Sequence, residues 1–208
     1  MKNSPTKKIL HDALILTAFT LVLGFVLGGV HEITKDRILA SELATEEAAY
    51  RAVFAEADAF EDLENAMEDL NLFLQELGYK DTIKSIKTAK DASGNTLGYV
   101  VNVIANDGSQ SSISFSVGIT SDGVVNGYSI TEIAETPGLG SKAEDEDFAA
   151  QFRGKDVDEI EDFEVVKSDA DSGEDIEAIT GATITSRAMA NGVNAAVEVF
   201  EEFLRDAS

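Results

Sequence analysis

The sequence predicts an α+β protein, in which a single N-terminal transmembrane helix precedes an extracytoplasmic domain with an antiparallel sheet flanked by helices. Three patterns support this fold class: an uncharged apolar run near the N-terminus, several segments with alternating apolar residues, and an amphipathic stretch near the C-terminus. They divide the 208 residues into a cytoplasmic N-terminus (1–12), a transmembrane helix (13–30), a juxtamembrane helical region (31–80) and a folded domain (81–208).

The chain is strongly acidic, with a net charge of −23 and an isoelectric point near 4.2. Such a surface repels DNA, RNA and anionic lipid headgroups, so we expect no nucleic-acid partner. There is no cysteine, and the only histidines are His11 and His31. Disulfides, thiolate catalysis and metal sites rich in Cys or His are therefore not expected. We interpret the many acidic residues as surface, and we predict no catalytic residue and no metal ligand.

The apolar run Ala13–Val30 contains no charged residue. As a helix it would span about 27 Å, enough to cross the hydrocarbon core of a bilayer. Lys2, Lys7 and Lys8 precede it, and acidic sequence follows. The positive-inside rule then places the N-terminus in the cytoplasm and the acidic bulk outside. A cleaved signal peptide is the alternative, but no Ala-x-Ala-like cleavage site follows the run, so we predict a single-pass anchor in the cell membrane.

Residues 31–79 have apolar residues at helical spacing, with charges between them. A second helix is predicted over about 63–77, and Gly78 suits its C-terminus. One stripe of this helix is apolar: Leu63, Met67, Leu70, Leu74 and Leu77.

From Asp81 onward the apolar period changes to two. The segments 82–89 and 97–105 flank the turn Asp91–Asn95, and 112–120 is followed by Asp122-Gly123, a strong hairpin signal. Ile113, Phe115, Val117 and Ile119 alternate with Ser and Gly. We therefore predict three or four antiparallel strands with one buried face.

The remaining third of the chain is predicted to hold a loop at 134–140, a short helix at 144–152, a last strand near 162–168 and a closing helix from about Ile184 to Arg205. The expected core stripe of the closing helix is Met189, Val193, Ala196, Val197, Phe200 and Leu204.

Four hydroxyl residues gather where the closing helix is expected to begin: Thr180, Thr183, Thr185 and Ser186. Thr180 or Thr183 would serve as an ordinary N-cap. Alternatively, a helix N-terminus stabilises a phosphate, to which one of these hydroxyls would be esterified, with Arg187 adding a charge-assisted contact. The residues alone leave both interpretations open.

The segment T-G-A-T-I-T-S, Thr180–Ser186, resembles the S/T-G-A-T-x-T/S-S signature of FMN-binding domains in respiratory complexes. In that family a membrane flavin transferase links FMN, through its phosphate, to the last Thr of S/T-G-A-T, which is Thr183 here. The family pattern has Asp three residues before the signature, where this chain has Glu177. The resemblance implies a site formed by Thr180, Gly181, Ala182, Thr183, Thr185 and Ser186.

A second block, E-T-P-G-L-G, is similar to a family loop that lies near the flavin. It consists of Glu135, Thr136, Pro137, Gly138, Leu139 and Gly140. A His often found two residues before that Glu is Ile133 in this chain.

The order of the anchor, the helices, the strands and both blocks resembles the G subunits of Rnf electron-transport complexes over nearly the whole chain. The related C subunits of Na⁺-pumping NADH:quinone reductases share both blocks. The resemblance implies an electron relay with covalent FMN and no substrate-turnover site of its own. Implied partners are other membrane subunits, a flavin transferase and the bilayer around residues 13–30. A standalone extracellular flavin carrier and a flavin-free anchored interaction domain remain alternatives.

Overall fold

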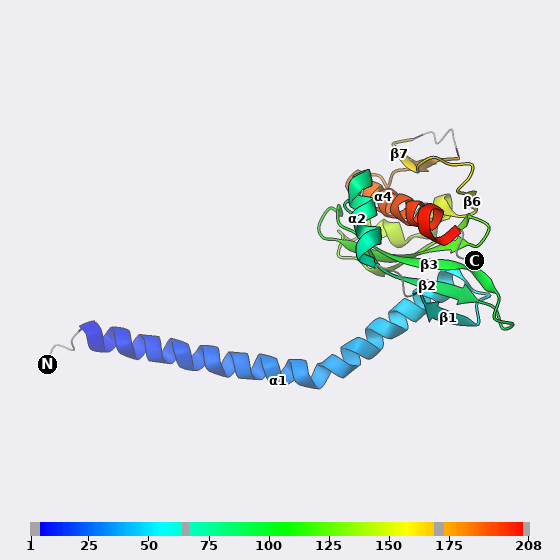
Figure 1. Ribbon diagram of the computed structural model, residues 1–208. Helices are drawn as coiled ribbons and strands as arrows, with labels where there is room; N and C mark the ends of the chain where they lie inside the picture. Colours follow the sequence, from blue (N-terminus) through cyan, green and yellow to red (C-terminus); the bar gives the residue numbers. More distant parts are fainter. Residues whose placement is uncertain (1–4, 64–66, 169–172, 206–208) are drawn as a thin grey trace. The chain divides into compact units, whose positions relative to one another are not determined.

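The computed structural model describes residues 5–63, 67–168 and 173–205. The chain divides into two units, residues 1–44 and 45–208. The first unit holds most of α1, a continuous helix over Pro5–Val53 (Figure 1). Its part from Lys8 is long and apolar enough to cross a membrane, and no side chain in its apolar window is buried. It includes the residues 13–30 that we expected to span the bilayer.

A six-stranded antiparallel sheet, in the order β1-β2-β3-β4-β5-β6, is the centre of the second unit. Its strands are β1 Ala59–Asp62, β2 Thr82–Lys90, β3 Thr96–Ala105, β4 Ile113–Thr120, β5 Val124–Glu132 and β6 Lys155–Asp156. Both predicted hairpin turns are confirmed. The carboxylate of Asp91 accepts the N–H groups of Ser93 and Asn95, and Gly123 adopts φ +88°.

Two helices cover one face of the sheet. They are α2, Met67–Leu77, which ends at Gly78 with φ +96°, and α4, Thr183–Val199, which continues as a π-helical turn over Phe200–Leu204. Every residue of the predicted core stripe of α4 is buried. On α2, Leu70 and Leu74 are buried but Leu77 is half exposed. The hydrophobic core lies between these helices and the side chains of Ile83, Val101, Val103 and Phe115.

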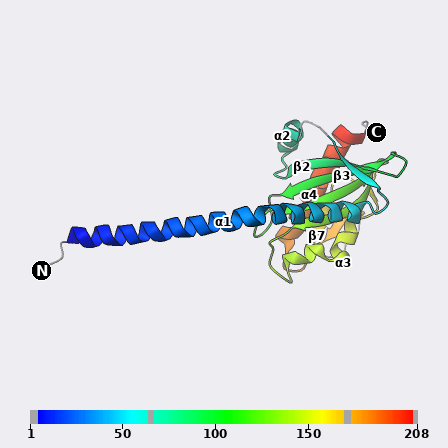
Figure 2. The same ribbon diagram turned by 90° about the horizontal axis from the view of Figure 1, so that it is seen from below.

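The expectation of one buried face was wrong, because the opposite face is covered as well. Ser116 and Gly118, which we expected to face solvent, are buried. They are covered by Tyr50 and Val53 in the last turn of α1 and by Phe54, which follows it directly. Figure 2 shows this end of α1 lying across the sheet, with α4 on the far side. The sheet is therefore the middle of three layers.

Glycines allow the close approach of α1. A Cβ on Gly118 would lie 2.7 Å from Cβ of Val53. A Cβ on Gly98 would lie 2.3 Å from the carbonyl oxygen of Ile119 in β4 and 2.7 Å from the ring of Phe54. A short polar network fixes the helix laterally: the amide of Asn102 donates to the Tyr50 hydroxyl (3.1 Å) and accepts from the Ser116 hydroxyl (2.6 Å).

Two further elements differ from the prediction. Residues 59–62, predicted as helix, form the edge strand β1, whose Phe60 contacts Tyr50 with ring centroids 5.4 Å apart. The predicted last strand is β7, Glu164–Val166, but it pairs in parallel with β8, Asp175–Glu177, in a separate two-stranded sheet. The predicted short helix is α3, Glu146–Ala149, extended by a 3-10 turn over Ala150–Phe152.

Candidate functional site

The loop before α4 leads into a helix whose N-terminus has no side-chain cap. Ala182 occupies the N-cap position with φ −133° and ψ 41°, and no side chain caps this helix. Thr183 is the first helical residue and is half buried. Neither Thr180 nor Thr183 is therefore the capping residue that a purely structural interpretation of the sequence required. The first backbone N–H groups of such a helix lack intrahelical partners and carry the positive end of its dipole, an arrangement that suits an anion.

Ser186 stabilises the conformation of this loop through hydrogen bonds to its backbone. Its buried hydroxyl accepts the N–H of Ile179 (3.0 Å) and donates to the carbonyl of Ala182 (3.0 Å). Gly181, between them, adopts φ +80°, a backbone conformation that L side chains rarely take. Ser186 and Gly181 together fix the turn that presents Thr183.

The second loop is tied to α4 by a buried carboxylate. The hydroxyl of Thr185 donates to Oε2 of Glu135 (3.2 Å). Oε1 of Glu135 accepts the backbone N–H groups of Ser109 (2.7 Å) and Gln110 (3.1 Å) in the β3–β4 loop. One side chain thus joins three segments that are far apart in the sequence, and both of its oxygens are satisfied, as a buried carboxylate requires.

Gly140 makes this junction possible. A Cβ at Gly140 would lie 2.6 Å from Oε2 of Glu135 and 2.8 Å from the Thr185 hydroxyl. The loop itself is a compact turn, in which the carbonyl of Thr136 accepts the N–H of Leu139 (3.1 Å). Leu139 is 42% exposed, and a Cβ on Gly181 would lie 3.3 Å from its Cδ2 atom. The two sequence blocks are therefore neighbours in space.

The structure sorts the predicted site residues by exposure. The exposed ones are Thr136, Pro137, Gly138, Leu139, Thr180 and Gly181; the buried ones are Glu135, Gly140, Ala182, Thr185 and Ser186. Thr183 lies between the two groups. The hydroxyls of Thr185 and Ser186 form hydrogen bonds within the protein, so these two residues stabilise the loops of the site.

Two basic side chains lie near the loop. Arg187, one turn after Thr183, is exposed, and among the described residues no carboxylate lies within ion-pair distance of it. Lys142 lines a shallow pocket of about 270 Å³ together with Glu177 and Thr180. The backbone N–H and C=O of Glu177 form hydrogen bonds with the side-chain amide of Gln151. Glu177 itself is exposed. No sequence pattern had indicated Lys142 or the β3–β4 loop as part of this region.

Both loops lie within a segment that matches a known protein family. The family model described as FMN-binding domain matches residues 108–198, which contain both loops, and the RnfG N-terminal region matches residues 1–53. The crystal structure of Shewanella oneidensis NqrC shares the fold, with a TM-score of 0.50 and 24% identity over 60% of this chain and 61% of that one. Fold and site thus define a protein of the FMN-binding-domain class.

Two relatives identify the family. The G subunit of the Na⁺-translocating ferredoxin:NAD⁺ oxidoreductase complex of Acetobacterium woodii is 31% identical over 94% of this chain and 93% of the relative. The G subunit of the proton-translocating complex of Clostridium ljungdahlii is 31% identical over 90% of this chain and 89% of the relative. The chain belongs to the family of G subunits of ion-translocating ferredoxin:NAD⁺ oxidoreductase complexes, which confirms the resemblance found in the sequence.

Proposed function

We propose that this chain is the electron-carrying G subunit of a membrane-bound, ion-translocating ferredoxin:NAD⁺ oxidoreductase, the Rnf complex, with FMN attached through its phosphate to Thr183. The observation that carries the proposal is the position of Thr183. It is the first residue of an uncapped helix, and it follows the loop whose Gly181 lies beside Leu139 of the second sequence block.

The four hydroxyls near the helix start are not equivalent. Those of Thr185 and Ser186 are buried and bonded to Glu135, Ile179 and Ala182. Thr180 is exposed but precedes the helix. Of the four, Thr183 combines an accessible side chain with the N–H donors of the first helical turn. It is also the residue that the family signature assigns.

The residues around Thr183 fit a phosphate ester. A phosphodiester carries one negative charge, which the helix N-terminus stabilises by about 0.3–1 kcal/mol. Arg187 adds a cation that has no carboxylate partner among the described residues. Pro137, Gly138 and Leu139 form an exposed, weakly polar surface beside Gly181 against which a flat ring can pack. When bound, FMN supplies one- and two-electron redox chemistry, and the chain's own residues bind it, orient it and limit its contact with water.

Covalent attachment suits an extracytoplasmic carrier. A noncovalent site stays filled only if free ligand remains near its dissociation constant, whereas an ester removes that condition. The proposed topology places residues 1–12 in the cytoplasm, 13–30 across the membrane, and both the helical region 31–80 and the domain 81–208 outside. Because residues 13–30 contain no charged side chain, this subunit offers no ion path and carries electrons only.

Intact-mass spectrometry and visible absorbance of protein made together with its own flavin transferase test the proposal. We expect an FMN-sized mass increase and the yellow colour of a flavin, with the adduct mapped to Thr183. Thr183→Ala should lose both, while Thr180→Ala, which removes the other exposed hydroxyl, should keep both. A colourless wild-type protein with the mass of its bare polypeptide would leave a flavin-free anchored domain. Copurification with other membrane subunits distinguishes a complex subunit from a standalone carrier.

A further inference from the structure

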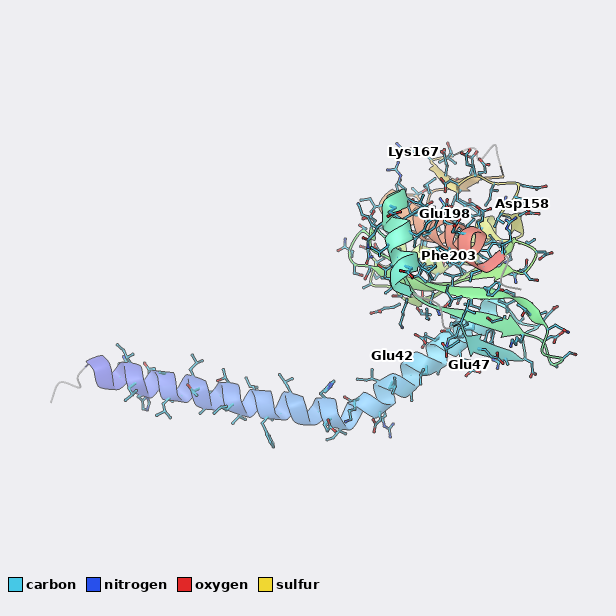
Figure 3. All side chains as sticks on the ribbon, in the orientation of Figure 1. Glu42, Glu47, Asp158, Lys167, Glu198 and Phe203 are labelled. Carbon is cyan, nitrogen blue, oxygen red and sulfur yellow. The ribbon has the colours of Figure 1, made fainter. Side chains whose placement is uncertain are left out.

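An open groove of about 750 Å³ lies between the end of α2, the strand β7 and the outer side of α4. The carboxylates that line it are Asp81, Asp107, Asp162, Glu164 and Glu198. Figure 3 labels Glu198, which lies on α4 on the side of α2. Arg187 lines the groove as well as lying one turn after Thr183, but Thr183 itself and the residues of the two sequence blocks do not line it.

The groove is acidic even after its internal pairs are counted. Among the described residues, the cations that line it are Lys80 and Arg187. The ammonium of Lys80 donates to both oxygens of Asp107, at 3.1 Å each, so this pair is neutral as a unit. The Tyr79 hydroxyl donates to Asp162 (3.2 Å) but adds no positive charge. The remaining charged groups that line the groove are four carboxylates and Arg187. Burial together with nearby Asp162 and Glu201 raises the pKa of Glu198.

Asp81 is the most buried of these carboxylates, and one of its oxygens lacks a hydrogen-bond partner among the described residues. Its side chain is only 6% exposed. The backbone N–H groups of Asp81 and Asn106 donate to its carboxyl, yet Oδ1 has no hydrogen-bond partner among the described residues. Burial raises the pKa of Asp81 to about 6, and Asp107 contributes in the same direction. A buried acceptor without a donor is unfavourable, so a ligand in the groove that supplies a donor to the Asp81 carboxyl would relieve this cost.

We infer that this groove binds a basic segment of a partner protein, with a Lys or Arg side chain of that segment donating to Asp81. A long basic side chain carries its charge on a flexible apolar stem, and Leu77 and Gly78 at the rim suit such a stem. A metal ion fits less well, because no group of three acidic or histidine side chains in the described ranges is arranged to hold one. Nucleic acid and anionic lipid are repelled by the same carboxylates.

Binding of a labelled Arg-Lys-Arg tripeptide with blocked termini tests this inference on the full-length protein in detergent micelles. Fluorescence anisotropy gives the affinity, and a Glu-Glu-Glu tripeptide is the probe control. Asp81→Asn keeps the shape of the side chain but removes its charge, and it should weaken binding about tenfold or more. Glu198→Gln, at the groove wall, should weaken it about threefold. Glu202→Gln and Asp69→Asn change exposed carboxylates outside the groove and should leave the affinity unchanged.

Saturable binding that Asp81→Asn and Glu198→Gln weaken, and that the two control variants do not, supports the inference. Equal weakening by all four variants would show attraction to the acidic surface in general and would overturn it, as would the absence of saturable binding. Displacement of the tripeptide by millimolar Ca²⁺ but not by an equal ionic strength of NaCl would also overturn it, in favour of a cation site. The measurement reports tripeptide binding and not flavin content, so its failure is distinguishable from a failure of the assignment of Thr183.

Discussion

The hydroxyl of Thr185 donates a hydrogen bond to the buried carboxylate of Glu135, fifty positions earlier in the chain. Each residue belongs to one of the two sequence blocks, so this bond is the direct link between them. Since the other oxygen of Glu135 holds the β3–β4 loop through Ser109 and Gln110, the geometry around Thr183 depends on a single carboxylate.

Thr185→Val should destabilise the domain and reduce flavin incorporation together. Valine has nearly the shape of threonine but leaves Oε2 of Glu135 without its donor, and a buried unsatisfied acceptor of this kind costs about 1–3 kcal/mol. Denaturant unfolding gives the loss of stability, and absorbance per polypeptide gives the flavin content. Thr185→Ser retains the hydroxyl and should stay close to wild type in both. Unfolding of Thr185→Val at the wild-type denaturant concentration would show that the bond does not hold the loops.

Two glycines of the second loop should respond differently to the same substitution. Gly140→Ala places a methyl group within 2.6 Å of Oε2 of Glu135, so the junction must open, and we expect loss of most flavin attachment with a cost above about 2 kcal/mol. Gly138→Ala meets no atom within 4 Å, and only its φ of +77° opposes it, at a cost of about 1 kcal/mol. Flavin content and thermal unfolding of the pair measure the difference. Equal effects would mean that backbone strain, not the contact with Glu135, governs this loop.

The stability of the protein should fall as the pH rises through the titration of Asp81. The folded-state pKa of about 6 lies above the unfolded value of 3.8, chiefly because the carboxyl is buried. Between these values the folded protein keeps a proton that the unfolded chain has released, so the free energy of unfolding decreases from about pH 4 to 6. Above this window the ionised Asp81 costs about 3 kcal/mol.

Asp81→Asn removes that titration, so the variant should be more stable than wild type near neutral pH by about 3 kcal/mol, and equal to it near pH 4. Urea unfolding at both pH values checks this expectation. Asp69→Asn, at an exposed site on α2, provides the matched control and should show no such difference. A stability gain in Asp81→Asn that is the same at both pH values would exclude titration of this carboxyl as the cause.

The hairpins at residues 82–132 and the core stripe of α4 could be predicted from the sequence because these features are local. Alternation and turn residues such as Asp122-Gly123 specify neighbouring strands within a few positions. The strand β1 was missed because four residues are too few to show a period and lie among acidic, helix-like sequence. The parallel pairing of β7 with β8 depends on long-range packing, which no local pattern encodes.

The candidate site likewise has local features that the sequence predicted and long-range contacts that it did not. Both blocks were visible as motifs, and the signature singled out Thr183. The sequence did not show that Thr185 and Ser186 point into the protein, or that Glu135 joins the loops, since each bond links the loop to a distant or buried partner. It also did not show that the end of α1 forms a third layer, because the stripe on a helix indicates a buried face but not the surface that buries it.

The residues at the end of α1 that cover the sheet should be required for a stable domain. Phe54 is buried against the sheet at Gly98 and Gly118, so Phe54→Ala should cost about 3–5 kcal/mol, as for other large core aromatic residues. Leu72→Ala, at a half-exposed position on α2, should cost much less.

A shortened chain that begins at Thr45 keeps Tyr50, Val53 and Phe54 and should fold as a soluble domain. One that begins at Ala59 lacks this layer, exposes the apolar side chains of Ala89 and Val100, and should aggregate or unfold at a markedly lower temperature. Thermal unfolding of the two chains side by side decides the point: equal stability would mean that α1 is only a tether and not part of the domain core.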